Sequence, residues 1–227
     1  NRSGLPTSST VPIAFPAYAD LVYDAWVREN ARYVNEKSDG KVAYAHISGM
    51  AEPQFYTFER DLYAVAHCKD GLIVDVRNNG GGWTADWVMA VLNARRHAYT
   101  VPRGGEKCYP QDRLIFYSWP KPATMMCNQY SYSDAEVVSH ALKTLKRGPP
   151  VGIPTFGAGI RTGAFQLVDG TNIRQPFRGW YLPDGTDMES HGAAPDVMVA
   201  ETPDDEQNGR RPQLDAAIRA TKEQLGK

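Results

Sequence analysis

One segment of the chain combines a short apolar strand, a run of glycines and the start of a helix. Residues Gly71–Arg77 read GLIVDVR, a nearly continuous apolar run that is typical of a strand covered on both faces. Asn78-Asn79-Gly80-Gly81-Gly82 follows directly, and Trp83, Trp87 and Val91 then recur at helical spacing. A doubly covered strand that turns straight into a helix predicts an α/β fold with a largely parallel sheet.

The same order of elements occurs on either side of this segment. Apolar spacing predicts a helix from Tyr18 to Ser38, a strand over 41–48 and an amphipathic helix from Phe55 to Val65. Farther along, a strand over Ala123–Cys127 precedes a helix over 134–146. Strands that alternate with helices imply crossover connections between parallel neighbours.

The remaining segments define the expected domain organisation. Residues 1–17 are rich in Ser, Thr, Pro and Gly and are interpreted as a linker or the end of a missing upstream domain. Residues 18–227 are expected to form one domain, with a long excursion over 100–122 and a closing helix over 212–225. Asp169-Gly170, between two strand-like runs, predicts a hairpin with a two-residue loop.

Composition excludes several classes of function. The 227 residues carry 25 Lys plus Arg against 26 Asp plus Glu, so the formal charge of -1 gives no net attraction for nucleic acid. No apolar run is long enough for a membrane span. Three cysteines without zinc-ligand spacing indicate neither a disulfide scaffold nor a zinc site, and reduced thiols favour a cytoplasmic location. No residue cluster implies a metal or an organic cofactor.

Two corners of the sequence could carry chemistry. The glycine run opens a helix, where backbone N–H groups and the helix dipole stabilise a phosphate or a developing oxyanion. The second corner is Asn128-Gln129-Tyr130-Ser131-Tyr132-Ser133-Asp134, between a strand and a helix. Ser133 could be a nucleophile presented at a sharp turn, or it could simply cap the helix in a capping box with Glu136.

A series of segments from about Trp26 to Leu225 resembles one family of enzymes. The segments are AWVRENARYVNEKSDGKVAYAHI, GLIVDVRNNGGG, NQYSYSDAEVVSHALK, VGIPTFG, LVDGTNIRQP, MESHGAAPDV and RRPQLDAAI. They are similar to the tail-specific, or C-terminal processing, peptidases and more closely to the tricorn branch. The resemblance implies a ClpP/crotonase-like spiral core of strand-strand-helix units and serine peptidase chemistry on short peptides.

The resemblance also implies roles for individual residues. Ser133 would be the nucleophile that forms an acyl-enzyme, and the N–H groups of Asp134 and Gly81 would form the oxyanion hole. Glu189, in Met188-Glu189-Ser190-His191-Gly192, would be the acidic member of a tricorn-type tetrad, which orients its neighbours.

The general base is expected to lie outside this chain. Processing peptidases carry a lysine before a Thr-Phe-Gly triplet, but here Pro154 precedes Thr155 and has no amine. The tricorn arrangement instead takes a histidine from a segment upstream of a PDZ module, and neither is present here. Of the five histidines, only His191 is a candidate substitute, because it lies two residues from Glu189. The resemblance further implies a homo-oligomer.

Departures from the family pattern leave other functions open. Tyr132 stands where the family has a small residue before the nucleophile, and a positive φ at that position would strain tyrosine. Together with Pro154, this departure favours the alternative of a non-catalytic pseudopeptidase that binds peptides or apolar ligands. A small-molecule acyl-CoA enzyme is a third possibility, supported by fold analogy alone.

Overall fold

The centre of the molecule is a five-stranded sheet in the order β1-β2-β3-β4-β7. The computed structural model describes residues 12–95, 98–107 and 118–226. The strands are β1 (Val42–His46), β2 (Gly71–Asp75), β3 (Ala123–Cys127), β4 (Pro150–Gly152) and β7 (Val197–Met198). Every neighbouring pair in this sheet is parallel, which confirms the predicted α/β fold with a largely parallel sheet.

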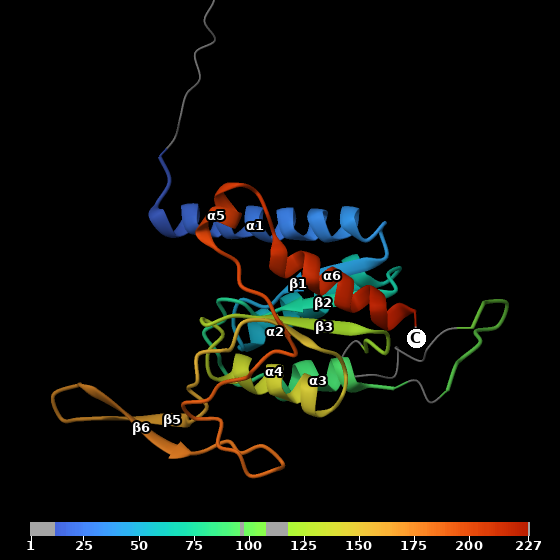
Figure 1. Ribbon diagram of the computed structural model, residues 1–227. Coiled ribbons are helices and arrows are strands. Elements are labelled where there is room, and N and C mark those ends of the chain that lie inside the picture. Colours follow the sequence, from blue (N-terminus) through green and yellow to red (C-terminus); the bar gives the residue numbers. More distant parts are fainter. Residues whose placement is uncertain (1–11, 96–97, 108–117, 227) are drawn as a thin grey trace, which may run out of the picture.

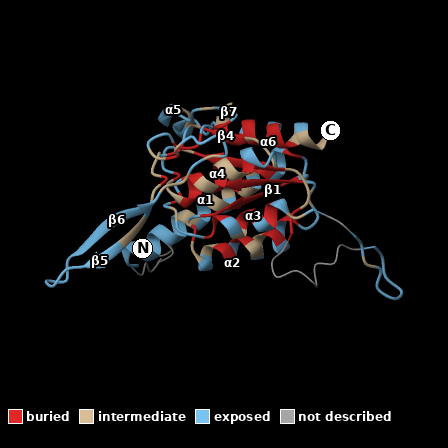
Figure 2. Cartoon of the chain, turned by 90° about the horizontal axis from the view of Figure 1, so that it is seen from below, coloured by how far each residue is buried: buried red, intermediate tan, exposed pale blue. Residues whose placement is uncertain are grey.

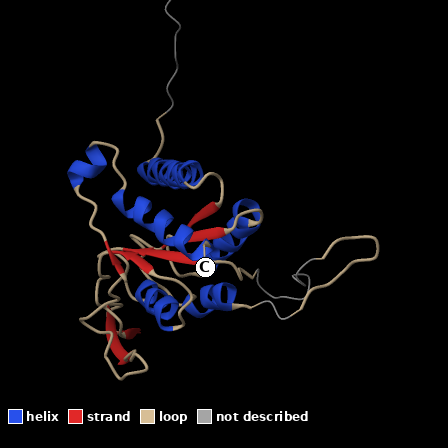
Figure 3. Cartoon of the chain, turned by 45° about the vertical axis from the view of Figure 1, so that its right-hand side comes forward, coloured by secondary structure: helices blue, strands red, loops and turns tan. Residues whose placement is uncertain are grey.

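Helices cover both faces of the sheet (Figure 1). One face carries α1 (Phe15–Lys37) and α6 (Pro212–Leu225), and the short α5 (Pro203–Gln207) precedes α6. The other face carries α2 (Glu52–Asp61), α3 (Ala85–Asn93) and α4 (Asp134–Thr144). Figure 3 shows the resulting three layers, with the red strands between two sets of blue helices.

The central strands are apolar throughout because alternate residues enter two different cores. All five residues of each of β1, β2 and β3 are buried. In β2, Leu72 and Val74 pack on the α2–α3–α4 side, whereas Ile73 packs with Leu214 on the α1–α6 side. Side chains on a strand point alternately to its two faces, so the continuous apolar run of β2 contributes side chains to both cores.

The ends of two helices differ from expectation. Helix α1 begins at Phe15 rather than Tyr18, and Pro16 lies in its first turn, where a missing N–H costs nothing. Helix α2 ends at Asp61 and continues as a π-helical turn, Leu62–Ala66. The extra residue of the π turn shifts the buried face, so Ala66 is buried while the expected core residue Val65 is 43% exposed.

The hairpin is present, but its expected two-residue loop is wrong. Strands β5 (Arg161–Gln166) and β6 (Asn172–Arg178) are joined through Val168, Asp169 and Gly170, since Leu167 N–H still donates to Thr171 O. Gly170 takes a φ of +86°, as the third residue of such a loop requires. The hairpin projects from the body and is largely exposed (Figure 2).

The shortest strands and the long excursion gave the weakest signals in the sequence. Strands β4 and β7 were not predicted, because with three and two residues they are too short for a period to show. Much of the expected excursion, residues 108–117, lies outside the described residues. No helix in the described part of the chain is both long and apolar enough to span a membrane.

Candidate active site

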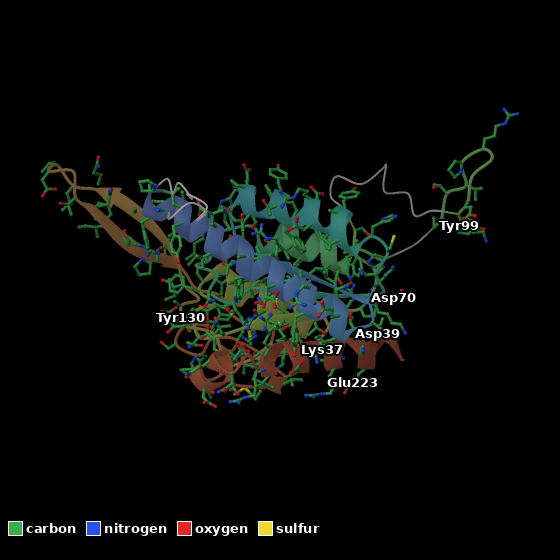
Figure 4. All side chains as sticks on the ribbon, turned by 90° about the horizontal axis from the view of Figure 1, so that it is seen from above. Lys37, Asp39, Asp70, Tyr99, Tyr130 and Glu223 are labelled. Carbon is green, nitrogen blue, oxygen red and sulfur yellow. The ribbon has the colours of Figure 1, made fainter. Side chains whose placement is uncertain are left out.

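The turns that follow β2 and β3 meet at the carboxyl ends of the parallel strands. Figure 4 shows Tyr130, in the second of these turns, at the opposite end of the molecule from Asp39 and Asp70, which precede β1 and β2. Tyr132 N–H donates to Asn79 O at 2.9 Å. The two turns are therefore joined directly, at the edge of an open α/β sheet where binding sites form.

A buried ion pair anchors the start of the glycine turn. Arg77 Nη2 lies 2.7 Å from Asp75 Oδ2, and the Tyr44 hydroxyl donates to the same oxygen at 2.7 Å. Burial alone would raise the pKa of Asp75, but the Arg77 guanidinium and the hydrogen bonds outweigh it and hold the pKa below its usual value. Asp75 thus stays charged and fixes the direction in which the chain leaves β2.

Ser133 lies at the strained point of the second turn. Its φ of 54° and ψ of -114° form a conformation that residues other than glycine rarely adopt, and α4 begins at the next residue. A strained non-glycine residue between a strand and a helix is typical of a turn that exposes a nucleophilic side chain to a binding site. The positive φ falls on Ser133 rather than on Tyr132, whose ring instead packs edge-on against Phe156, with centroids 5.0 Å apart.

The carboxylate of Glu136 holds this turn in place. Glu136 is fully buried, and its Oε1 accepts the N–H groups of Ser133 and Ala158, each at 2.8 Å. Its Oε2 accepts the Thr155 hydroxyl and the Gly157 N–H, each at 2.6 Å. The capping-box interpretation therefore accounts for Glu136, and it is compatible with a nucleophilic Ser133 because the same carboxylate ties that residue to the Thr-Phe-Gly triplet.

Gly81 packs directly against the Ser133 turn. A Cβ on Gly81 would lie 2.8 Å from Ser133 Cβ and 3.2 Å from Asp134 N, and the φ of Gly81 is +82°. The Asp134 N–H is in the first turn of α4, and no acceptor for it lies among the described residues. The absence of a Gly81 side chain thus keeps open the space in front of this amide.

The Gly81 amide itself is already engaged. It donates to Asn79 Oδ1 at 2.8 Å, and Asn79 is fixed by a second bond from its Nδ2 to Ile47 O at 2.7 Å. The adjacent Gly82 N–H has no acceptor in the described part of the chain. An oxyanion bound at Gly81 would therefore share its donor with Asn79 or displace it.

The side chain of Asp134 links the two turns a second time. Its Oδ2 accepts the N–H of Ala85 at 2.8 Å and so caps the start of α3. Burial raises the pKa of the Asp134 carboxyl to about 6, although the hydrogen bond from Ala85 acts to lower it.

We expect Asp134→Asn to stabilise the fold near neutral pH. A carboxyl whose pKa is raised in the folded state destabilises that state at high pH, and the penalty disappears as pH falls from about 6 toward 4. Asn keeps an acceptor for Ala85 and carries no charge. Chemical denaturation should show the variant about 1–3 kcal/mol more stable at pH 7.5, with the difference shrinking at pH 4. An unchanged difference at both pH values would contradict the expectation.

Glu189 lies in the loop that packs on the Thr-Phe-Gly segment. Its Oε2 accepts the N–H of Ile160 at 2.9 Å, and the next residue, Ser190, donates its N–H to Gly157 O at 2.8 Å. The loop is thus joined to Ser133 through the groups that Glu136 holds. No hydrogen bond between Glu189 and Ser133 occurs among the described residues.

No histidine ring is hydrogen-bonded to Ser133 in the described part of the chain. Three of the rings bond to backbone carbonyl groups: His46 to Arg77, His140 to Gly192 and His191 to Glu189. His191 is exposed, and its Nδ1 is 2.8 Å from the carbonyl oxygen. His97 lies outside the described residues.

A cleft of about 490 Å³ opens over Ser133. Part of its lining comes from the glycine turn and from the first turns of α3 and α4. The β5–β6 hairpin contributes Arg161, Thr162, Arg174 and Arg178. The cleft can take an extended polar ligand across the Ser133 hydroxyl. No cluster of three or more metal-ligating side chains occurs among the described residues.

Comparison with known proteins shows the family of the chain. Residues 41–199 match the model of peptidase family S41. The chain belongs to peptidase family S41. The matched residues include both turns, the Ser133 cleft and the loop of Glu189. All the candidate site residues of this S41 chain therefore lie within the region that matches the family.

The relatives of this S41 chain include tricorn proteases. It is 41% identical over 202 residues to tricorn protease homolog 1 of Streptomyces coelicolor, covering 87% of the chain and 18% of that protein. It is 36% identical over 206 residues to the tricorn protease of Thermoplasma acidophilum, covering 89% of the chain and 19% of that protein. The crystal structure of the tricorn protease superposes with a TM-score of 0.79 at 33% identity, covering 90% of the chain and 20% of the other. The chain thus spans about a fifth of the length of these relatives.

Proposed function

We propose that this chain is the core of a serine peptidase that hydrolyses short peptides through an acyl-enzyme on Ser133. The observation that carries the proposal is the strained Ser133 turn, held against the glycine turn of an S41 fold. We also propose that residues 18–227 form this core, together with the first turn of α1 from Phe15, and that the residues before it are a linker or the end of an upstream domain.

The proposed reaction follows from the groups around Ser133. Its hydroxyl oxygen attacks the peptide carbonyl carbon while a base takes the hydroxyl proton. The negative charge on the carbonyl oxygen is stabilised by the Asp134 N–H, which has no acceptor among the described residues, and by the Gly81 N–H once its bond to Asn79 breaks. The amine then leaves with a proton, and water hydrolyses the ester on Ser133.

We propose that the base is a histidine from an upstream segment of the full-length protein, near a PDZ module, with Glu189 as the acidic partner. Two observations support this: no described histidine is hydrogen-bonded to Ser133, since three of them bond to backbone carbonyl groups instead, and the relatives are much longer than this chain. A groove of about 550 Å³ also runs between α1, which contributes the exposed side chains of Phe15, Tyr18 and Val22, and the segments that follow β1 and β2, and we propose that an upstream segment covers it.

We expect the isolated chain to hydrolyse peptides at least about a thousandfold more slowly than the full-length protein, because members of a catalytic triad act as a unit. The ratio of the two rates is measured from initial rates on a library of short fluorogenic peptides, with both proteins at the same molar concentration. Circular dichroism of the isolated chain at near-neutral pH, together with a cooperative thermal unfolding transition, serves as the control for folding. Equal rates would place the base within this chain and overturn this part of the proposal.

A further inference from the structure

Three arginines of the β5–β6 hairpin face the cleft that contains Ser133. Arg161 lies on β5 and Arg174 and Arg178 lie on β6, and all three line the cleft. Figure 2 shows that this hairpin leaves the body of the molecule as an exposed arm. The arginines are therefore brought to Ser133 by a dedicated element rather than by the sheet.

Two of these arginines lie close together on neighbouring strands, because the guanidinium groups of Arg161 and Arg178 are each 5.9 Å from the centroid of the Phe177 ring. Arg161 and Arg178 are direct cross-strand partners, and like charges in that position repel each other. A register shift between Arg161 and Thr162 interrupts the alternation of faces, so Arg174, which pairs with Ala164, shares the face of Thr162 rather than that of Arg178. Arg174 Nη2 donates to Thr162 Oγ1 at 2.7 Å, which holds its guanidinium beside another residue that lines the cleft.

The positive charge of the three side chains is not neutralised by the protein. None of them lies within ion-pair distance of a carboxylate in the described part of the chain, where other arginines, such as Arg77, have such partners. Two carboxyl groups, Asp86 and Asp134, also line the cleft. Asp134 Oδ2 accepts the Ala85 N–H, and the charge of Arg161 acts from a distance to lower the pKa of Asp134 without forming an ion pair.

We propose that Arg161, Arg174 and Arg178 form a substrate subsite that binds a carboxylate carried by the peptide, beside the bond that Ser133 attacks. A guanidinium presents paired N–H donors that match the two oxygens of a carboxylate. The carboxylate comes from an acidic side chain or from the free C-terminus of the peptide. This inference deepens the proposed function and rests on it for the position of the cleaved bond.

Binding without turnover tests the subsite separately from catalysis. In the full-length protein carrying Ser133→Ala, fluorescence anisotropy measures the Kd of labelled peptides that contain Glu or Gln, each with a free or an amidated C-terminus. We expect the carboxylate-bearing peptide to bind about tenfold more tightly than its neutral counterpart. Adding Arg174→Gln and Arg178→Gln should remove the difference, whereas Arg219→Gln, on the distant α6, should keep it.

The outcomes separate the two sources of the carboxylate and the two proposals. A Glu-dependent difference assigns the subsite to side chains, and an amidation-dependent difference assigns it to the C-terminus. Equal Kd values for all four peptides, or a difference that survives both arginine substitutions, overturn the subsite. If full-length wild type cleaves peptides without preferring carboxylates, the subsite fails and the proposed function stands. If the full-length wild type binds carboxylate-bearing peptides selectively but cleaves no peptide, the subsite stands and the proposed function fails.

Discussion

Replacing Ser133 by alanine in the full-length protein should reduce peptide hydrolysis by about four to six orders of magnitude. The substitution removes the only atom that is proposed to bond to the substrate, and the oxyanion donors alone give little turnover. Steady-state rates on fluorogenic peptides, with protein purified in the absence of other peptidases, measure the loss.

Ser133→Gly provides a matched control for this experiment. Both variants lack the hydroxyl, so both should be inactive, but glycine adopts a φ of 54° and ψ of -114° without strain. We expect the glycine variant to be about 1 kcal/mol more stable than the alanine variant in chemical denaturation. If Ser133→Ala retains the rate of the wild type, the protein does not use Ser133 as a nucleophile. If wild type is equally inactive yet binds peptides, the pseudopeptidase alternative is favoured.

Gly81→Ala should abolish activity almost as completely while Ser133 stays in place. The new Cβ would lie 2.7 Å from Tyr132 O and 2.8 Å from Ser133 Cβ, so the two turns would have to separate. It would also lie 3.2 Å from Asp134 N, in front of the proposed oxyanion donor. Loss of one such donor alone costs about two to three orders of magnitude in kcat. We expect at least this loss, together with a lower free energy of unfolding because φ is +82°.

The neighbouring glycine gives a control in the same turn. A Cβ on Gly80 would meet no atom within 4 Å, so Gly80→Ala should change stability by less than about 0.5 kcal/mol and the peptidase rate only a few-fold. Parallel kinetic and denaturation measurements on the two variants separate the effect of position 81 from a general effect on the turn. Comparable rates for Gly81→Ala and Gly80→Ala would contradict the close approach of Gly81 to the site.

The sequence predicted the central elements of the fold because their signals are local. Ala123–Cys127 and Pro212–Leu225 match their expected bounds, since each has a regular period and a clear end. The glycine turn was also predictable as a corner next to the proposed nucleophile, because only glycine allows the backbone approach that Gly81 makes to Ser133.

Other features depend on contacts between distant segments. The capping box revealed that Glu136 bonds to Ser133, but its bonds to Thr155, Gly157 and Ala158 join segments about twenty residues apart and leave no local signal. The grouping of the hairpin arginines at the cleft was missed for the same reason. The strain expected at Tyr132 falls one residue later, because the turn reverses at the residue that directly precedes α4.

The most direct test of the account is to map the site of covalent modification by a fluorophosphonate, which reacts with activated serine hydroxyl groups. Full-length protein is labelled, digested and analysed by mass spectrometry, with Ser133→Ala as the control. We predict a single stoichiometric adduct on the peptide that contains Ser133, with parallel loss of peptide hydrolysis and no adduct in the variant. Hydrolysis that persists in fully labelled protein, or an adduct on another serine that tracks the loss of activity, would contradict the assignment of Ser133 as the nucleophile.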